Sequence, residues 1–453
     1  MSEETFSEQA FLQSLCAEYE KHNQIDPVWY ERWDVKRGLR NADGTGVMAG
    51  VTGIGNVVGY YMQDGERFPM DGKLIYRGIN LNDLVDGFIR EDRFGYEETA
   101  YLLLFGALPT REQLEQFRSL LAERRVLPPN FTEDMILKAP SRDVMNKLGR
   151  SVLALYSYDE TPEDRSLAAE IDKAITLLAR VPVIVAHAFA VKRHYFDDES
   201  LYLHRPQADL GVAENFLYSV RHDNRYTPEE ARLLDLCMVL HAEHGGGNNS
   251  AFACRVLSSS GTDIYSAISA AIGSLKGPRH GGANKKVMEM FAGIEEGVRD
   301  WKDDDEVRAY LARILRREAG DGSGLIYGMG HAIYTLSDPR AVLLKKYANA
   351  VAEQKGMTDE LHLYETVERL TPEVLSASGQ RKVVCANVDL YSGLVYKMMG
   401  IPEELYTPLF AVARMVGWCA HRIEETCGSN NRIIRPAYKA VCPTRPFVPL
   451  DQR

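Results

Sequence analysis

The chain has 453 residues, of which 45% are hydrophobic and 26% are charged, and its formal net charge is -11. This composition is typical of a soluble globular protein, and the length predicts two or three domains. The acidic balance argues against nucleic acid as the main partner, because phosphate binding needs clustered lysine and arginine, although a few buried arginines can still form a positive pocket for a small anion.

The cysteines and the N-terminal residues indicate a reducing compartment. The seven cysteines are irregularly spaced and include no CxxC pair, a pattern that favours free thiols over a disulfide framework or a zinc site. The first eight residues are polar and acidic, unlike a signal peptide. The longest apolar stretch, near Val181 to Val191, is too short to span a bilayer. We therefore expect a cytoplasmic protein.

In chain order, a short β region is followed by helices. Residues 46–61 combine glycine with β-branched residues, which is typical of short strands and turns. The glycines at 53, 55 and 59 do not match a dinucleotide fingerprint, because the third is one residue late. Helical periodicity and capping signals then mark three clear helices, at residues 97–105, 228–243 and 304–318.

A helix of another kind is predicted at residues 264–275. It consists mainly of alanine, serine, isoleucine and glycine, so it should pack closely on several sides. The helix leads directly to the turn Gly277-Pro-Arg-His280. A buried helix that ends at such a turn can hold the His280 side chain rigidly at a site.

Two histidines three residues apart, His241 and His244, precede three glycines. They can share one face of a helix. The segment does not match the zinc motif HExxH and specifies no third ligand, so we expect no metal. The alternative is a pair of helix-terminal histidines that bond to backbone carbonyls, beside glycines that let a ligand approach closely.

Two further segments place polar residues in loops or at helix starts. His331 follows Gly328 and Gly330, which suit a loop that passes close to a ligand. Asp338 and the proline after it predict a helix start, with the aspartate as N-cap. Arg340 would then lie in the first turn, where a guanidinium and backbone N–H groups can bind a carboxylate together.

The last candidates are one acid and three arginines. Asp389 lies in a largely uncharged stretch; if buried, it could act as a general base near neutral pH, and otherwise it could be a helix N-cap. Arg414 lies among apolar residues at helical spacing and needs a partner if it is buried. Arg432 and Arg435, near the C-terminus, could equally form a solvated basic tail.

Taken in this order, the segments resemble the citrate synthase family. The matching segments read HAEH, GPRHGGAN, GMGHAIYTLSDPR, NVDLYSG, FAVAR and IIRP, with GKLIYRGI and FGYEETAYLLLFGALPT upstream, so the resemblance covers most of the chain. Two departures stand out. HAEH replaces the more usual HADH or HSDH, and Ala332 and Thr335 stand where some relatives have basic residues that contact CoA.

The resemblance implies a mainly α, multihelical two-domain fold with a small N-terminal β region, assembled as a homodimer. A large domain, residues 1–281 and 396–453, would hold the dimer contacts and the oxaloacetate site. A small domain, residues 282–395, would hold the CoA-binding loops and the catalytic aspartate. The active site would lie in the cleft between the two domains.

The resemblance also implies the reaction and its residues. Acetyl-CoA would condense with oxaloacetate and water to give citrate and CoA, the first step of the tricarboxylic acid cycle, without a metal or cofactor. His280, His331 and Asp389 would be catalytic. The oxaloacetate site would comprise His244, Arg340, Arg414 and Arg435 of the partner subunit, and the CoA-binding loop would include Gly328 and Gly330.

Three alternatives remain open at this stage. A 2-methylcitrate synthase would use propionyl-CoA with the same residues, and one methyl group is worth only about 1–3 kcal/mol of discrimination. A catalytically inactive protein could share the scaffold, because fold does not guarantee function. A metallohydrolase built on His241 and His244 would require bound zinc.

Overall fold

The computed structural model describes residues 7–379, 383–428 and 432–453. The chain divides into two compact units, one formed by Met1–Val51 with Ile434–Arg453 and the other by Thr52–Ile433. The first unit contains helix α1 (Glu8–His22), the short helix α2 (Val28–Arg32) and two single 3-10 turns. None of its described residues is buried, so it has no core of its own.

The second unit begins with the predicted β region, a small antiparallel sheet in the order β1-β2-β3. Strands β1 (Gly55–Gln63) and β2 (Glu66–Tyr76) form a hairpin, and β3 (Ile79–Asn80) pairs with the end of β2. Asp64 and Gly65 both have positive φ, which is typical of a tight two-residue hairpin turn. A register shift between Val58 and Tyr60 bends β1.

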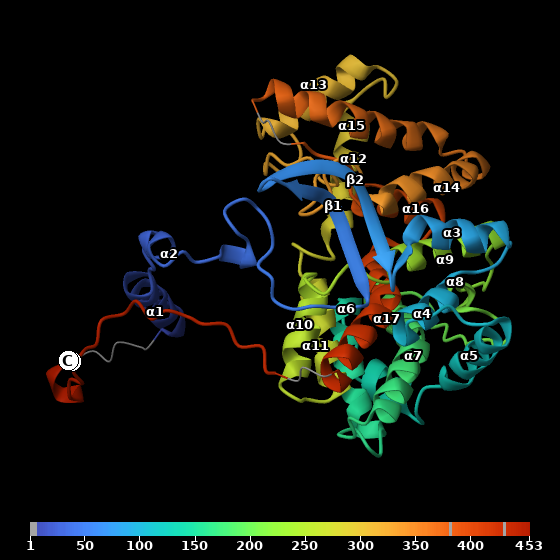
Figure 1. Ribbon diagram of the computed structural model, residues 1–453, viewed down its shortest axis with the longest axis horizontal. Helices are drawn as coiled ribbons and strands as arrows, with labels where there is room; N and C mark the ends of the chain where they lie inside the picture. The colour runs from blue at the N-terminus through green and yellow to red at the C-terminus, as the bar shows by residue number, and fades with distance from the viewer. Residues whose placement is uncertain (1–6, 380–382, 429–431) are drawn as a thin grey trace. The chain divides into compact units, whose positions relative to one another are not determined.

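Helices form the rest of the second unit (Figure 1), which confirms the predicted fold class. The three predicted helices correspond to α4, α9 and α13, and the last two end two and three residues earlier than predicted. The helices are α3 (Leu81–Arg90), α4 (Tyr96–Phe105), α5 (Arg111–Arg124), α6 (Val144–Ala154), α7 (Leu167–Phe196), α8 (Val212–Val220), α9 (Pro228–His241), α10 (Asn249–Ser259), α11 (Ile264–Lys276), α12 (Ala283–Gly297), α13 (Asp304–Leu315), α14 (Pro339–Lys355), α15 (Thr358–Ala377), α16 (Val388–Met398) and α17 (Tyr406–Cys427).

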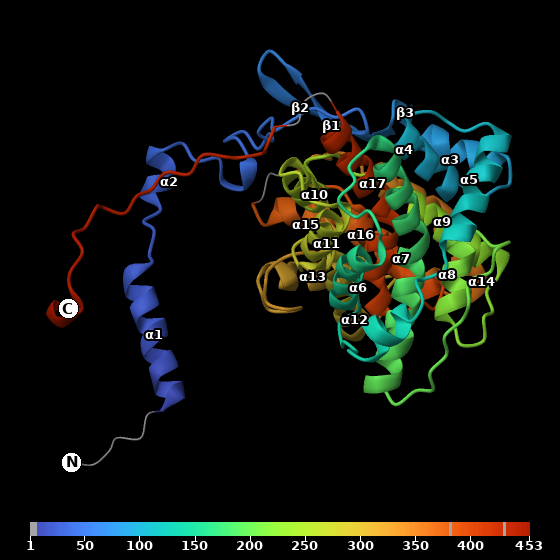
Figure 2. The same cartoon turned by 90° about the horizontal axis from the view of Figure 1, so that it is seen from below.

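Helix α17 runs through the interior of this unit (Figure 2). Every residue from Tyr406 to Arg422 is buried, and the helix contacts α4, α7, α9, α10 and α11. The predicted small-residue helix is α11, which packs on α6, α10 and α17. A buried ion pair between Arg422 and Glu170 joins α17 to α7. This core fixes the position of Arg414 in the middle of α17.

Helix α7 extends well beyond the apolar stretch noted in the sequence. It has 30 residues and a mean hydropathy of 2.0 over its most apolar window, so by length and composition it could cross a membrane. However, 78% of that window is buried inside the protein, as expected for a core helix.

Helices α12 to α16 pack largely against one another. Helix α13 contacts α15, and α12 and α14 both contact α16; α14 also contacts α9 and β2. Figure 1 shows these helices grouped at one end of the unit. These helices correspond to the predicted small domain. The exact boundary between the small and the large domain stays a prediction.

Candidate active site

The predicted histidines and Arg340 lie at helix ends and in the loops between helices, whereas Arg414 lies in the middle of α17. Three aromatic rings define the centre of the site. The His244 and His331 ring centroids are 5.2 Å apart, and the Tyr334 ring is stacked on His331 at 4.6 Å. Arg340 lies over the Tyr334 ring, so α14 reaches the same place.

The loop before α14 fixes the orientation of His331. The backbone N–H groups of Ile333 and Tyr334 donate to His331 Nδ1 over 3.0 and 3.1 Å. Because Nδ1 accepts these hydrogen bonds, the proton of the neutral ring is on Nε2. His331 can therefore donate a hydrogen bond from Nε2 to a ligand oxygen.

Gly328 and Gly330 join this loop to the start of α16. Both have positive φ, and a Cβ at Gly328 would lie 2.8 Å from Leu390 Cδ1. Gly330 N donates to Cys385 O over 2.7 Å, and Asn387 Nδ2 donates to Gly330 O over 2.9 Å. The glycines thus let the loop pack against α16, close to Asp389. Their predicted contact with CoA stays a prediction.

Asp338 is the N-cap of α14, as predicted, and Arg340 lies in the first turn. The sequence did not reveal that Asp338 also binds the guanidinium. Arg340 Nε and Nη2 donate to the two carboxylate oxygens over 3.0 and 2.7 Å, and both side chains are buried. Val388 N donates to the same carboxylate over 3.2 Å. Asp338 therefore holds Arg340 in place and ties α14 to α16.

Asp389 lies in the first turn of α16, but it is not the N-cap. Asn387 caps this helix by accepting a hydrogen bond from Asp389 N over 3.0 Å, which leaves the Asp389 carboxylate available for chemistry. Burial raises the pKa of Asp389 to about 6, even though Arg340 and Arg414 favour its charged form. Such a carboxylate is a suitable general base near neutral pH.

His280 is oriented by a serine that the sequence analysis did not single out. His280 Nε2 lies 3.0 Å from Ser250 Oγ, which also accepts a hydrogen bond from Trp418 Nε1 over 3.1 Å. Burial and then Arg414 lower the pKa of His280 to about 4, so the ring is neutral at pH 7. Ser250 Oγ donates its own proton to Asn248 Oδ1 over 2.9 Å.

Because the Ser250 hydroxyl has only one proton, the direction in which it donates determines which tautomer of His280 fits this contact. Trp418 Nε1 can only donate, so this proton goes either to Asn248 or to His280. If it goes to His280 Nε2, the ring carries its own proton on Nδ1 and can donate from there to a substrate oxygen. This arrangement requires the Asn248 amide to be flipped, so that Nδ2 instead of Oδ1 faces the serine.

Arg414 is buried with most of its donors unused. Its Nε donates to His241 O over 2.5 Å, and the guanidinium lies over Phe410 at 4.8 Å. Within the described part of the chain, its two Nη atoms have no hydrogen-bond partner, and neither have His244 Nε2 and the Tyr334 hydroxyl. Burial lowers the pKa of Arg414 to about 10, which leaves it charged at pH 7. The pocket thus presents donors that an anionic ligand would satisfy.

His241 and His244 have separate roles. His241 Nδ1 bonds to Cys237 O over 2.7 Å at the end of α9, which confirms the helix-terminal interpretation for this residue. His244 instead faces His331, as described above. Among the residues that the structure describes, no group of three or more His, Cys, Asp or Glu side chains could hold a metal.

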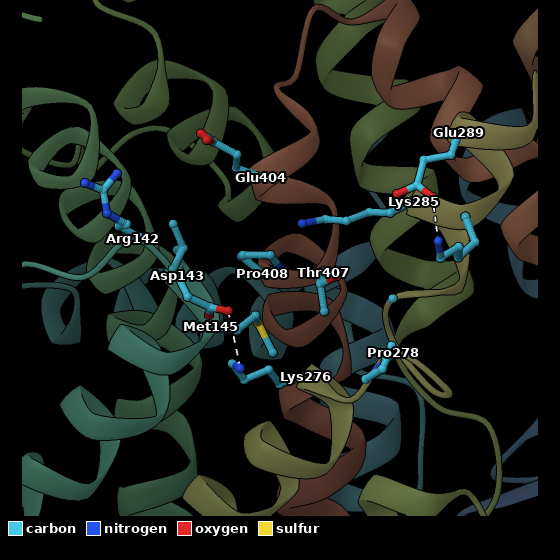
Figure 3. Close-up of a pocket in the computed structure, with 13 residues that line it drawn as sticks. Arg142, Asp143, Met145, Lys276, Pro278, Lys285, Glu289, Glu404, Thr407 and Pro408 are labelled. Carbon is cyan, nitrogen blue, oxygen red and sulfur yellow. Dashed lines mark hydrogen bonds and ion pairs between the residues drawn. The ribbon is translucent and has the colours of Figure 1, made fainter. Parts of the chain in front are cut away.

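A cavity of about 300 Å³ lies beside the turn that carries His280 (Figure 3). Pro278 and Gly282 of this turn line it, but none of the predicted catalytic side chains does. Its carboxylates are paired: Asp143 with Lys276, Glu289 with Lys286, and Glu404 with Lys192. The cavity therefore does not mark the site defined by the histidines.

Arg435 is the one predicted site residue that lies outside the second compact unit. It is exposed and belongs to the first compact unit, whereas His244, His280, His331, Arg340, Asp389 and Arg414 all belong to the second. Arg432 is also exposed. The role of Arg435 in a partner subunit stays a prediction.

Comparison with known proteins agrees with this geometry. Residues 43–437 match the family described as the citrate synthase C-terminal domain. The chain belongs to the citrate synthase family. It is 35% identical to a citrate synthase from Deinococcus radiodurans, over 81% of this chain and 89% of that protein. It is also 33% identical to a 2-methylcitrate synthase from Shewanella oneidensis, over 84% of this chain and 92% of that protein.

A solved structure supports the same assignment. The citrate synthase from Thermoplasma acidophilum, in a ternary complex with carboxymethyl coenzyme A and oxaloacetate, superimposes with a TM-score of 0.74. The two chains are 25% identical, and the match covers 92% of this chain and 99% of that one. The family assignment therefore rests on both sequence and fold.

Proposed function

We propose that the chain condenses acetyl-CoA with oxaloacetate and water to give citrate and CoA, the first step of the tricarboxylic acid cycle. The observation that carries this proposal is the set of buried, unpartnered donors on Arg414 and His244, within the described residues, next to the oriented Nε2–H of His331. A small dianion with a ketone oxygen matches these donors. Arg340 supplies a second buried cation.

Oxaloacetate would bind with its carboxylates on the arginines. Arg414 offers four N–H donors from its two Nη atoms, an arrangement suited to bidentate binding of a carboxylate. His331 would donate from Nε2 to the ketone oxygen, polarise the carbonyl and supply a proton as the new bond forms. His244 would complete the contacts to the substrate.

Acetyl-CoA would lose a methyl proton to Asp389. His280, as a neutral imidazole, would donate a hydrogen bond to the thioester oxygen and stabilise the developing enolate. The resulting carbon nucleophile would attack the ketone carbon of oxaloacetate, and water would then hydrolyse the citryl thioester. The chain's own side chains carry all of these steps, so the proposal includes no metal or cofactor. The loop with Gly328 and Gly330 would contact CoA.

The proposed assembly is a cytoplasmic homodimer in which Arg435 of the partner subunit completes the oxaloacetate site. Two observations support this proposal. The first compact unit, which contains Arg435, has no buried residue among those described. It also exposes large apolar side chains, listed here with their exposed fractions: Phe11 49%, Leu15 48%, Tyr438 94% and Phe447 83%. A second copy of the chain would cover such side chains.

The proposed reaction is tested by measuring the release of free CoA thiol from purified protein with oxaloacetate and either acetyl-CoA or propionyl-CoA. We expect faster turnover with acetyl-CoA. Faster turnover with propionyl-CoA would assign a 2-methylcitrate synthase, a candidate that the Shewanella relative supports. No release with either thioester, from folded protein, would assign an inactive scaffold.

A further inference from the structure

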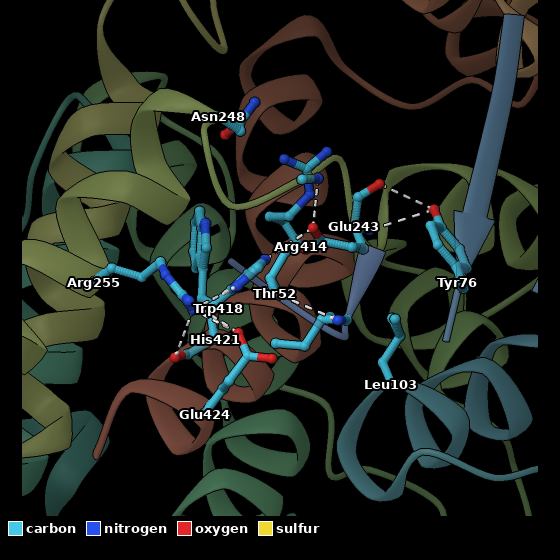
Figure 4. Close-up of polar contacts among 12 residues, drawn as sticks. Thr52, Tyr76, Leu103, Glu243, Asn248, Arg255, Arg414, Trp418, His421 and Glu424 are labelled. Atoms are coloured by element: carbon cyan, nitrogen blue, oxygen red, sulfur yellow. Dashed lines mark hydrogen bonds and ion pairs between the residues drawn. The ribbon is translucent and has the colours of Figure 1, made fainter. Parts of the chain in front are cut away.

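Glu243, next to the site residue His244 in the chain, is a fully buried carboxylate that the proposed mechanism does not use (Figure 4). Its Oε1 accepts hydrogen bonds from Gly245 N over 2.5 Å and from His421 Nε2 over 2.9 Å. Its Oε2 is buried and has no hydrogen-bond partner among the described residues. A buried carboxylate oxygen without a donor is costly, which calls for an explanation.

The contacts of His421 indicate that Glu243 is ionised. Arg255 Nη1 donates to His421 Nδ1 over 3.0 Å, so the histidine proton is on Nε2 and points to Glu243. Burial alone would raise the pKa of Glu243, but His421, Arg414 and Gly245 N outweigh burial and lower it. A negative charge is therefore buried beside the site residue His244.

This charge lies next to Arg414. A Cβ at Gly417 would lie 2.6 Å from Glu243 Oε2 and 3.3 Å from Arg414 Cδ, so both side chains border the same glycine. On the opposite side, a Cβ at Gly55 would lie 2.9 Å from Glu243 Cγ. The two glycines make room for the glutamate, which has one methylene more than the aspartate usual in HADH and HSDH segments.

We propose that Glu243 is the counter-charge of Arg414 and thereby sets the affinity of the pocket for oxaloacetate. The inference rests on the proposed function. In the empty pocket the carboxylate stabilises the buried guanidinium, whose Nη atoms have no hydrogen-bond partner in the described chain. When the dianion binds, the same carboxylate repels it. Glu243 does not touch the substrate and acts through Arg414, so it is a positioning residue.

The other arginine of the site also has a carboxylate beside it. Arg340 is paired with Asp338 in a bidentate contact, whereas Glu243 bonds directly to His421 and only borders Arg414. The two guanidinium groups and the two carboxylates together carry no net charge. A dianion is then held mainly by directed hydrogen bonds rather than by excess positive charge. Removal of the charge at position 243 should therefore increase the attraction for oxaloacetate.

The experiment compares two isosteric pairs at position 243, Glu with Gln and Asp with Asn. In Glu243→Gln, the amide oxygen can still accept from Gly245 N and His421, and an NH₂ group replaces the unpartnered oxygen. In titration calorimetry, we expect the neutral member of each pair to bind oxaloacetate on the order of tenfold more tightly. The reason is that one negative charge close to the bound dianion, and partly shielded from water, has been removed. The gain should shrink with added salt.

Steady-state kinetics should separate this role from a purely structural one. In Glu243→Gln, the KM for oxaloacetate should fall in parallel with the dissociation constant, and the KM for acetyl-CoA should stay unchanged. Glu424→Gln is the matched control, because it removes a carboxylate that contacts Arg255 and Gly53 instead of Arg414. We expect no change in oxaloacetate affinity in this variant.

Equal or weaker binding of oxaloacetate by the neutral member, in folded protein, would overturn the inference. If Glu243→Gln does not fold, the comparison of Glu243→Asp with Glu243→Asn decides in the same way. The proposed function fails separately, if the unaltered protein neither binds oxaloacetate nor releases CoA thiol.

Discussion

At the scale of single residues, burial changes the proton affinities of Asp389 and His280 in opposite directions. The pKa of Asp389 rises to about 6 and that of His280 falls to about 4. Above pH 6, therefore, the first is a carboxylate and the second a neutral imidazole. These are the forms that a base and a hydrogen-bond donor need at the acetyl group.

The pH dependence of turnover should report the ionisation of Asp389. We expect kcat/KM to fall tenfold per pH unit below about pH 6, because the base is then protonated. Protonation of His280 should add a second loss only below about pH 4. The measurement is thiol release between pH 4.5 and 8. A flat profile down to pH 5 would contradict the assignment of Asp389.

Replacement of Asp389 by Asn should abolish turnover and stabilise the protein. The folded-state pKa of about 6 exceeds the unfolded value near 3.9, so the folded state binds more protons between these values. The contribution of the protonated Asp389 carboxyl to the free energy of unfolding is thus fully present below pH 4. It is lost as the pH rises through 6, because the buried carboxyl must then ionise. Above pH 6 the Asn variant should gain up to about 3 kcal/mol of unfolding free energy. Urea unfolding at pH 4 and 7.5 tests this, since the gain should vanish at pH 4.

The sequence singled out the residues that the proposed mechanism uses, but not their partners. His244, His280, His331, Arg340, Asp389 and Arg414 could be chosen because each lies in a recognisable segment. Their neighbours Ser250 and Glu243 could not be assigned, because these contacts depend on packing between segments far apart in the chain. Ser250 and His280, for example, are 30 residues apart; the first lies in α10 and the second in the turn between α11 and α12. The bond from Arg340 to Asp338, only two residues away, depends on the rotamer of the arginine.

At the scale of elements, the β1–β2 hairpin supports the loop that carries His331. Thr335 Oγ1 donates to Gly59 O over 2.5 Å and accepts from Met70 N over 3.2 Å. Gly72 N donates to Ser337 O over 3.1 Å. Thr335 is therefore bound to the hairpin. The sequence predicted a β region but not this contact, because it joins segments about 265 residues apart.

Gly72→Ala should disturb this contact and reduce turnover. A Cβ at Gly72 would collide with Ser337 O, which is backbone and must move. Displacement of the His331 loop by about 1 Å should lower kcat on the order of 100-fold, and the overpacking should cost about 1–3 kcal/mol of stability.

Gly87→Ala in α3 is the control, because its Cβ meets nothing within 4 Å. This variant should keep full turnover and gain about 0.5–1 kcal/mol. Equal turnover of the two variants would rule out the supporting role.

At the scale of the whole molecule, the pocket of one chain is short of positive charge for a dianion. Arg340 is paired with Asp338, and Arg414 borders Glu243. A third arginine, Arg435 of the partner subunit, would correct this balance. In the sequence, only the IIRP segment pointed to Arg435. The sequence could not show to which compact unit Arg435 belongs, because this unit combines both ends of the chain.

Complementation between two inactive variants tests whether Arg435 acts across the dimer. We expect Arg435→Ala and Asp389→Ala to be nearly inactive as homodimers. In a heterodimer isolated with two different tags, the Arg435→Ala subunit keeps its own Asp389 and receives an intact Arg435 from its partner. One of the two sites is then complete, so thiol release should return to about half of the unaltered rate. If Arg435 acts within its own chain, neither site is complete and the heterodimer stays inactive. Failure to isolate any heterodimer from co-expressed, folded chains would instead overturn the proposed dimer, because a shared site requires the two subunits to remain associated during purification.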